Sequence, residues 1–178
     1  MIVRREGPAD HDAVRALHRS AFARDPATGE TRGPDGVVEP RLVDELREDP
    51  GFLPHLSLVA VREDDVVTGH VILTRAWLEP AGAPVLGLGP LGVLPEAQGS
   101  GVGTALVHSV LAVAEAAGET LVALLGDPAY YGRFGFRAAE ELGVRAPEPL
   151  WGRHFQARWL AGPRTGGTFR YADPFQGL

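Results

Sequence analysis

Cysteine and lysine are both absent from this sequence of 178 residues. Without cysteine, the chain has no disulfide, no thiolate metal site and no cysteine nucleophile. All 17 basic residues are arginine. A phosphate-binding loop of the GxxxxGK(S/T) type and Schiff-base chemistry are therefore excluded as well, because both need a lysine amine. Covalent catalysis through sulfur or through an imine is ruled out.

A long apolar run is also missing. About 18 consecutive apolar residues are needed to cross a membrane, and the sequence contains no such stretch. The first residues, MIVRREGPADHD, lack the apolar core of a signal peptide. We therefore expect a cytoplasmic protein with no membrane partner. The net charge of −6, with arginines scattered among acidic residues, argues against a nucleic-acid partner.

The composition, 44% hydrophobic and 22% charged, is that of a soluble globular protein, and the length suits one domain over residues 1–178. Hydrophobic periodicity and turn residues predict the order of its elements. Asp10 is expected to cap the first helix and Asp127 the last one. We expect strands at 1–5, 84–94 and 120–126, a hairpin over 55–79, helices at 11–22, 39–49, 104–118 and 128–135, a mobile loop at 23–36, and strand-like runs at 151–160 and 167–175.

Six glycines gather in one stretch, LGLGPLGVLPEAQGSGVGTALV, at residues 86–107. A glycine in regular structure costs roughly 0.5–1 kcal/mol relative to alanine, so such a cluster marks unusual dihedral angles or a close approach by another group. Residues 87–92 match the GxGxxG pattern of dinucleotide-binding proteins, but Pro95 follows where that pattern needs a helix. Residues 98–106 do open a helix, where free N–H groups and the helix dipole form an anion site. A tight turn with glycines for packing is the alternative for this second segment.

The stretch from Gln98 to Gly103, QGSGVG, matches the Q/R-x-x-G-x-G/A motif of the GCN5-related N-acetyltransferase (GNAT) family. Further along, Tyr131 stands four residues before Gly135-Phe136 and resembles the second signature of that family. The order of elements agrees, and the resemblance covers essentially the whole chain, most closely residues 57–137. It implies an α/β fold, a mixed three-layer sandwich of the acyl-CoA N-acyltransferase type. Such a fold has a mostly antiparallel sheet, a splayed parallel strand pair, and helices on both faces.

The resemblance implies an acetyl-CoA-dependent N-acetyltransferase, which passes acetyl from the thioester directly to an amine of a small molecule or peptide. The N–H groups of the loop would hold the pyrophosphate, and the end of the preceding strand would bond the pantetheine amides, much as an added strand does. The glycines would keep side chains out of the cofactor's path. Pro90, which has no N–H, suits a break in the sheet. The cofactor-binding residues implied are Leu91, Gly92, Val93, Gln98, Gly99, Ser100, Gly101, Val102, Gly103 and Thr104.

Tyr131 matches the position of the family's proton donor to the departing thiolate, and it is the catalytic residue that the resemblance implies. It could instead be an aromatic packing residue, with Tyr130 beside it as core or cavity wall. The family often has an asparagine near position 124, where this sequence has Leu124. Asp127 is not its equivalent. This departure leaves a second hypothesis open, a non-catalytic module that senses acyl-CoA.

No motif identifies the general base or a metal site. His70 and Glu79, on the strands of the hairpin, could reach the acceptor side. His11 and His18 could share a helix face as a solvent-exposed pair, but no carboxylate stands at metal-ligand spacing from a histidine pair. We therefore expect no metal, and a monomer or a homodimer.

The acceptor would enter, by the same resemblance, between the early helices and the last strands. In this sequence those parts are the loop 23–40 and the tail from Trp151 onward. An acidic loop with Asp25, Glu30 and Asp35 would suit an amine. The aromatic residues expected along one face of a tail strand are Trp151, Phe155 and Trp159.

Overall fold

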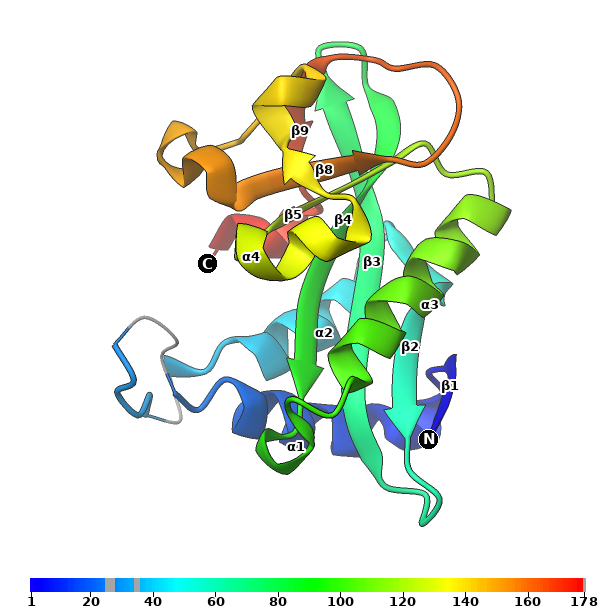
Figure 1. The fold of residues 1–178 in the computed structure, drawn as a ribbon, viewed down its shortest axis with the longest axis vertical. Coiled ribbons are helices and arrows are strands. Elements are labelled where there is room, and N and C mark those ends of the chain that lie inside the picture. Colours follow the sequence, from blue (N-terminus) through cyan, green and yellow to red (C-terminus); the bar gives the residue numbers. More distant parts are fainter. Residues whose placement is uncertain (25–27, 34–35, 178) are drawn as a thin grey trace.

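The computed structural model describes residues 1–24, 28–33 and 36–177, and its strands form one nine-stranded sheet (Figure 1). The strands lie in the order β1-β2-β3-β4-β5-β8-β6, while β9 pairs with both β3 and β7. Pairing is antiparallel except between β4 and β5 and between β7 and β9. The strands are β1 Ile2–Arg5, β2 Phe52–Val61, β3 Val67–Glu79, β4 Ala83–Val93, β5 Leu121–Leu125, β6 Arg137–Ala138, β7 Val144–Arg145, β8 Phe155–Trp159 and β9 Gly167–Arg170.

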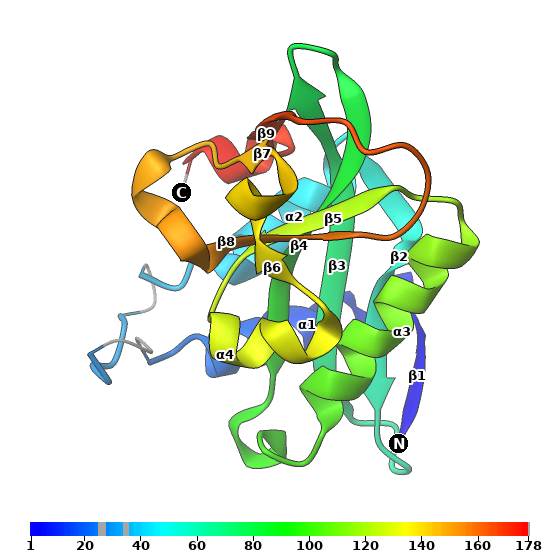
Figure 2. The same cartoon turned by 45° about the horizontal axis from the view of Figure 1, so that its top comes forward.

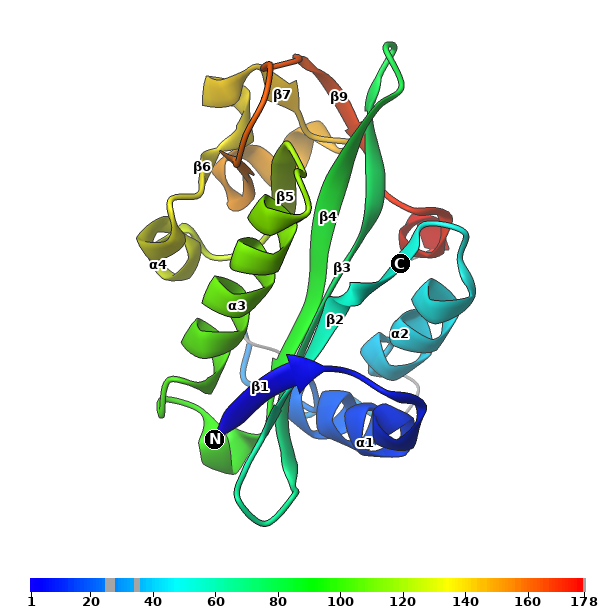
Figure 3. The same ribbon diagram turned by 90° about the vertical axis from the view of Figure 1, so that its right-hand side faces the viewer.

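Helices cover both faces of the sheet, which confirms the predicted three-layer fold (Figure 3). Helices α1 and α2 pack on one face and α3 on the other. The first eight residues of β3 are all buried, because both faces of this central strand are covered. The helices are α1 His11–Ala21, α2 Glu39–Glu48, α3 Val102–Ala116 and α4 Pro128–Tyr131.

Strands β4 and β5 are paired only near their beginnings, at Leu86–Val122 and Gly87–Ala123. Strand β3 stays paired with β4 as far as Val93. Between Leu88 and Leu91, β4 has one residue more than the paired part of β3, and this β-bulge changes the direction of the strand. From Leu88 onward the β5-facing edge of β4 is therefore open, which is the predicted splayed parallel pair.

The tail differs from the sequence prediction. Its first strand begins only at Phe155, because Gly152 has a φ of 46° and the residues from Pro149 to His154 form 3-10 turns. Trp151 therefore shares no strand face with Phe155 and Trp159. The second strand ends at Arg170, and Asp173–Gly177 form another 3-10 turn. Figure 2 shows these tail elements gathered around β5 and the adjacent end of β3, away from β1.

Two further points concern single elements. The Asp10 carboxylate does not cap α1 as predicted, since it accepts from the Gly7 N–H at 2.8 Å and from Arg4 at 2.7 Å. The short strands β6 and β7 were not predicted from the sequence, because a strand of two residues shows no hydrophobic periodicity.

Across the part of the chain that is described, no helix is long and apolar enough to cross a membrane.

Candidate active site

The glycine-rich loop leaves a row of N–H groups at the start of α3. Gly99 and Gly101 have φ values of 76° and 91°, a left-handed conformation that glycine adopts without strain. The N–H of Ala105 bonds to the Gly101 carbonyl at 2.9 Å, and within the described residues no backbone carbonyl accepts from the N–H groups between Gly99 and Thr104. Free N–H groups at the positive end of a helix dipole can bind an anion.

The side chains of Gln98 and Ser100 each donate a hydrogen bond to the backbone next to this loop. The Gln98 amide nitrogen donates to the Val93 carbonyl over 3.1 Å, and the Ser100 hydroxyl donates to the Ala97 carbonyl over 2.6 Å. The first bond ties the loop to the end of β4, and the second ties it to the turn that follows β4. The Gln98 side chain therefore bonds to the protein backbone.

A cavity of about 400 Å³ lies against the loop. Arg133, from the turn after α4, supplies a cation to its lining, and its guanidinium lies 4.9 Å from the centre of the Tyr130 ring. Sequence reasoning missed Arg133, which no motif position singles out. Of the implied cofactor-binding residues, Gly92, Ser100 and Val102 do not line this cavity. Its lining residues are Leu91, Val93, Ala97, Gln98, Gly99, Gly101, Gly103, Thr104, Tyr130 and Arg133.

The six glycines of the junction do not share one physical reason. A Cβ on Gly92 would lie 2.8 Å from His18 Nδ1, one on Gly103 would lie 2.6 Å from the Tyr130 hydroxyl, and one on Gly87 would lie 2.9 Å from the Tyr171 ring. These three glycines make room for other side chains of the protein. The other three, Gly89, Gly99 and Gly101, have positive φ values and open space around them.

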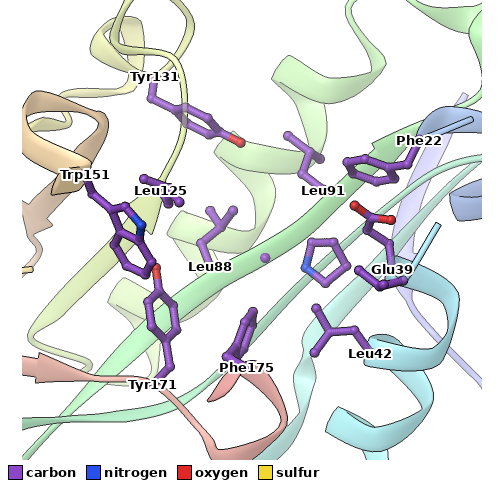
Figure 4. Close-up of a pocket in the computed structure, with 13 residues that line it drawn as sticks. Phe22, Glu39, Leu42, Leu88, Leu91, Leu125, Tyr131, Trp151, Tyr171 and Phe175 are labelled. Carbon is purple, nitrogen blue, oxygen red and sulfur yellow. The ribbon is translucent and has the colours of Figure 1, made fainter. Parts of the chain in front are cut away.

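A second, larger cavity of about 530 Å³ opens on the far side of the splayed strands, between β4, α2, α4 and the tail (Figure 4). Leu91 lines both cavities, so they lie next to each other at the open edge of β4. This is where an acceptor was expected to enter. The lining residues are Phe22, Val38, Glu39, Leu42, Leu88, Gly89, Pro90, Leu91, Leu125, Tyr131, Trp151, Tyr171 and Phe175.

Tyr131 stands in this second cavity, at the end of α4. The helix begins with the predicted cap, since the Asp127 carboxylate accepts from the Ala129 N–H at 2.9 Å. The Tyr131 ring packs edge-on against Tyr130 with centroids 4.9 Å apart, and its hydroxyl points into the cavity (Figure 4). Burial, assisted by Tyr130, raises the pKa of Tyr131 above its usual value. The hydroxyl is therefore neutral near pH 7 and can donate a proton or a hydrogen bond.

Tyr171 provides a second hydroxyl in the same cavity, which sequence reasoning missed. Its ring packs against Phe169 and Phe175, each with centroids 4.7 Å apart. Burial raises the pKa of Tyr171, and the nearby Tyr131 hydroxyl adds to that rise. The only sequence signal was its place in an aromatic tail run. No motif marked it.

The two candidate bases lie elsewhere. Glu79 is paired with Arg170 at 3.1 Å at the far end of β3, and His70 is fully buried between the sheet and α1. Neither residue lines either cavity. His70 Nδ1 lies 2.8 Å from His18 Nε2, so His18 is a buried partner and not a solvent-exposed one.

The buried histidines belong to a polar cluster with Glu6, Ser57 and Arg47. Burial lowers the pKa of both His18 and His70. Burial alone would raise the pKa of Glu6, but hydrogen bonds with His70, Arg47 and Ser57 lower it. Near pH 7 the cluster therefore holds Glu6 as a carboxylate and both imidazoles as neutral rings.

Other expectations concern the acidic loop and a metal. Asp25 and Asp35 lie outside the described residues, and Glu30 is exposed and lines neither cavity. Across residues 1–24, 28–33 and 36–177, no group of three or more histidine, aspartate or glutamate side chains could hold a metal ion. The segment 87–92 lies inside β4 and opens no helix, so it does not form a dinucleotide-binding turn.

Known proteins resemble this chain over nearly its whole length. The sequence model of the Acetyltransferase (GNAT) family matches residues 15–136. The N-acetyltransferase YhbS of Escherichia coli K12 is 34% identical over 94% of this chain and 92% of its own length. The crystal structure of Escherichia coli YhbS in complex with CoA superposes with a TM-score of 0.84 at 29% identity, over 98% of this chain and 91% of that one. A GNAT family acetyltransferase from Brucella melitensis in complex with acetyl-CoA gives 0.77 at 32% identity, over 98% and 97%.

Proposed function

The chain belongs to the GNAT acetyltransferase family, and on that premise we propose that it transfers acetyl from acetyl-CoA directly to an amine held in the larger cavity. One observation carries the proposal. The two cavities share Leu91 in their lining, the edge of β4 is open there, and the Tyr131 hydroxyl points into the larger cavity. A thioester lying along that edge has the amine on one side and the remainder of the cofactor on the other.

The smaller cavity suits the pyrophosphate and the pantetheine arm. The N–H groups between Gly99 and Thr104 lie at the positive end of the α3 dipole, where they can bind the pyrophosphate. Arg133 adds a cation to the same cavity. The β4 edge from Leu91 to Val93 offers main-chain groups to the pantetheine amides, as in strand addition. The family relationship and the CoA-bound relatives support this use of the cavity.

The larger cavity is where the bonds change. The neutral amine nitrogen bonds to the carbonyl carbon, the carbon–sulfur bond breaks, and the sulfur takes the proton of Tyr131. The nitrogen, positively charged after the attack, releases one proton to solvent, and the Tyr131 phenolate takes one proton from solvent, which restores the enzyme. In this proposal, a backbone N–H near Leu91 donates to the carbonyl oxygen as negative charge builds there. The raised pKa keeps Tyr131 protonated until this step, and the same apolar surroundings make the thiolate more basic.

The test compares Tyr131→Phe with Tyr171→Phe in an assay of thiol release over a panel of amines. We expect Tyr131→Phe to lower kcat by about 10²–10⁴-fold, the range for loss of a general acid, with an unchanged Kd for acetyl-CoA by calorimetry. If Tyr171→Phe causes that loss and Tyr131→Phe does not, the proton donor is Tyr171. If the wild-type protein binds acetyl-CoA but releases no thiol with any amine, the chain is an acyl-CoA sensor and the proposed transfer is wrong.

A further inference from the structure

We propose, on the basis of the function above, that the acceptor is a small primary amine with an apolar body of aromatic size, and that its amino group binds Glu39. The larger cavity has two unlike sides. Figure 4 shows the Glu39 carboxylate directed into it from α2, on the side opposite Trp151 and Tyr171.

Glu39 has one oxygen that lacks a partner. Its Oε1 lies 3.6 Å from an Arg32 nitrogen, but Oε2 is buried and has no hydrogen-bond partner within the described residues. The whole side chain is only 14% exposed, so water does not easily compensate. A buried carboxylate oxygen is costly unless a donor reaches it. An amine N–H or an ammonium is a donor of suitable charge.

The remainder of the lining favours an apolar body. Phe22, Leu42 and Phe175 surround the Glu39 end, and Leu88, Leu125 and Trp151 extend the surface toward Tyr131. Removing the apolar part of a ligand from water against such side chains stabilises binding in proportion to its area. A cavity of about 530 Å³ has room for an aromatic ring with a short amine side chain.

The same lining disfavours two other kinds of amine. Glu39 is the one carboxylate among the described residues that line the cavity, so the second charge of a diamine would be buried there without a partner. A peptide amine would bring several amide groups against a mostly aliphatic and aromatic wall, where they would lose their hydrogen bonds to water.

The experiment measures binding to the CoA-saturated full chain by calorimetry, which needs no turnover. The probes are 2-phenylethylamine, its alcohol counterpart 2-phenylethanol, 1,5-diaminopentane and a neutral tripeptide with a free amino group. We expect 2-phenylethylamine to bind at least tenfold more tightly than each of the other three. A diamine or tripeptide that binds as tightly as the aromatic amine would overturn the proposal.

Glu39→Gln separates the role of the charge from a structural role. We expect this variant to lose the preference for the amine over the alcohol by about tenfold, with an unchanged KM for acetyl-CoA. Glu45→Gln is the matched control, because Glu45 lies on the same helix, is 46% exposed and pairs with Arg41 outside the cavity. An amine preference that survives Glu39→Gln would contradict the assignment.

Trp151→Ala provides a second variant should Glu39→Gln unfold. Trp151 is only partly buried, and its loss should weaken 2-phenylethylamine about tenfold while leaving 1,5-diaminopentane within twofold. Equal losses for both amines would contradict the apolar assignment. Failure of the transfer reaction is visible separately, as absence of thiol release with every amine although the binding preferences persist.

Discussion

The two cavities that share Leu91 are built in different ways. The smaller one is made largely by the backbone of one continuous segment, from Leu91 to Thr104, and its glycines and N–H groups are its chemistry. The larger one is lined by residues that come from the end of α1 at Phe22, from α2, β4, β5 and α4, and from the tail. A backbone-built site depends on conformation and tolerates side-chain changes, whereas a side-chain-built site depends on each residue that reaches it.

The largest expected effect comes from adding a side chain to a glycine that lines the smaller cavity. In Gly103→Val, the new atoms would meet the Tyr130 hydroxyl, because even a Cβ would lie 2.6 Å from it. Overpacking of this kind costs about 1–3 kcal/mol. Since Tyr130 lines the smaller cavity, a shift of its ring would oppose CoA there, and a cost of that size raises the Kd of CoA by about 5–150-fold in calorimetry.

Gly118→Ala is the control for that variant. Gly118 follows α3 with a φ of 78°, so alanine should lower stability by about 1–2 kcal/mol. It lies at the other end of the helix from the glycine-rich loop, and its Kd for CoA should not change. If both variants bind CoA like the wild type, the smaller cavity is not the cofactor site.

A change of pH should alter the stability of the fold through the buried polar cluster around His18 and His70, which lines neither cavity. Because the folded pKa of His18 and His70 is lowered, the unfolded chain binds more protons than the folded one below the usual value of about 6.5. The contribution of the two histidines to the free energy of unfolding is therefore fully present above that pH and is lost as the pH decreases. The lowered pKa of Glu6 acts in the same direction below about 4.5.

The measurement is the thermal midpoint at pH 7.5 and pH 5.5, with His18→Gln beside the wild type. Glutamine can still donate to His70 but cannot titrate, so we expect the variant to lose less stability on acidification. A midpoint that stays constant or rises toward pH 5.5 would show that the histidines are not buried as neutral groups.

The smallest effect should come from Gln98→Ala. Its side chain makes one hydrogen bond to Val93, worth about 0.5–1.5 kcal/mol, and the ligand-facing N–H groups remain in place. We expect the Kd for CoA to rise by less than about tenfold. A loss as large as that of Gly103→Val would mean that the Gln98 amide itself holds the cofactor, and the contrast between the two cavities would be weaker.

The sequence predicted α3 and the start of α4 well, because their signals are local. The apolar spacing of α3 and the Asp127 cap are patterns within a few residues, and both are confirmed. The larger cavity had no such pattern. Glu39 and Tyr171 are far apart in the chain, and only the fold brings them to one cavity. Sequence reasoning therefore placed Tyr131 by resemblance and missed Glu39 and Tyr171.

The histidine pair shows a different limit. On α1, His18 follows the buried Leu17 and was expected at the surface, but Gly92 on β4 leaves room for its ring. The absence of one side chain on a strand thus decides the burial of another on a helix. A single sequence does not reveal such a pairing, because neither residue is unusual by itself.

The donor and acceptor of each hydrogen bond from Glu6 through Ser57 and His70 to His18 can be assigned. The Ser57 hydroxyl donates its single proton to Glu6 over 2.5 Å, so its oxygen must accept from His70 Nε2 at 3.0 Å. His70 Nδ1 then carries a lone pair and accepts from His18 Nε2. Both rings are thereby held in the same tautomer by one carboxylate. His18 Nδ1 then carries a lone pair that has no hydrogen-bond partner and lies next to Gly92. The nitrogen chemical shifts of both rings should show a protonated Nε2 and an unprotonated Nδ1.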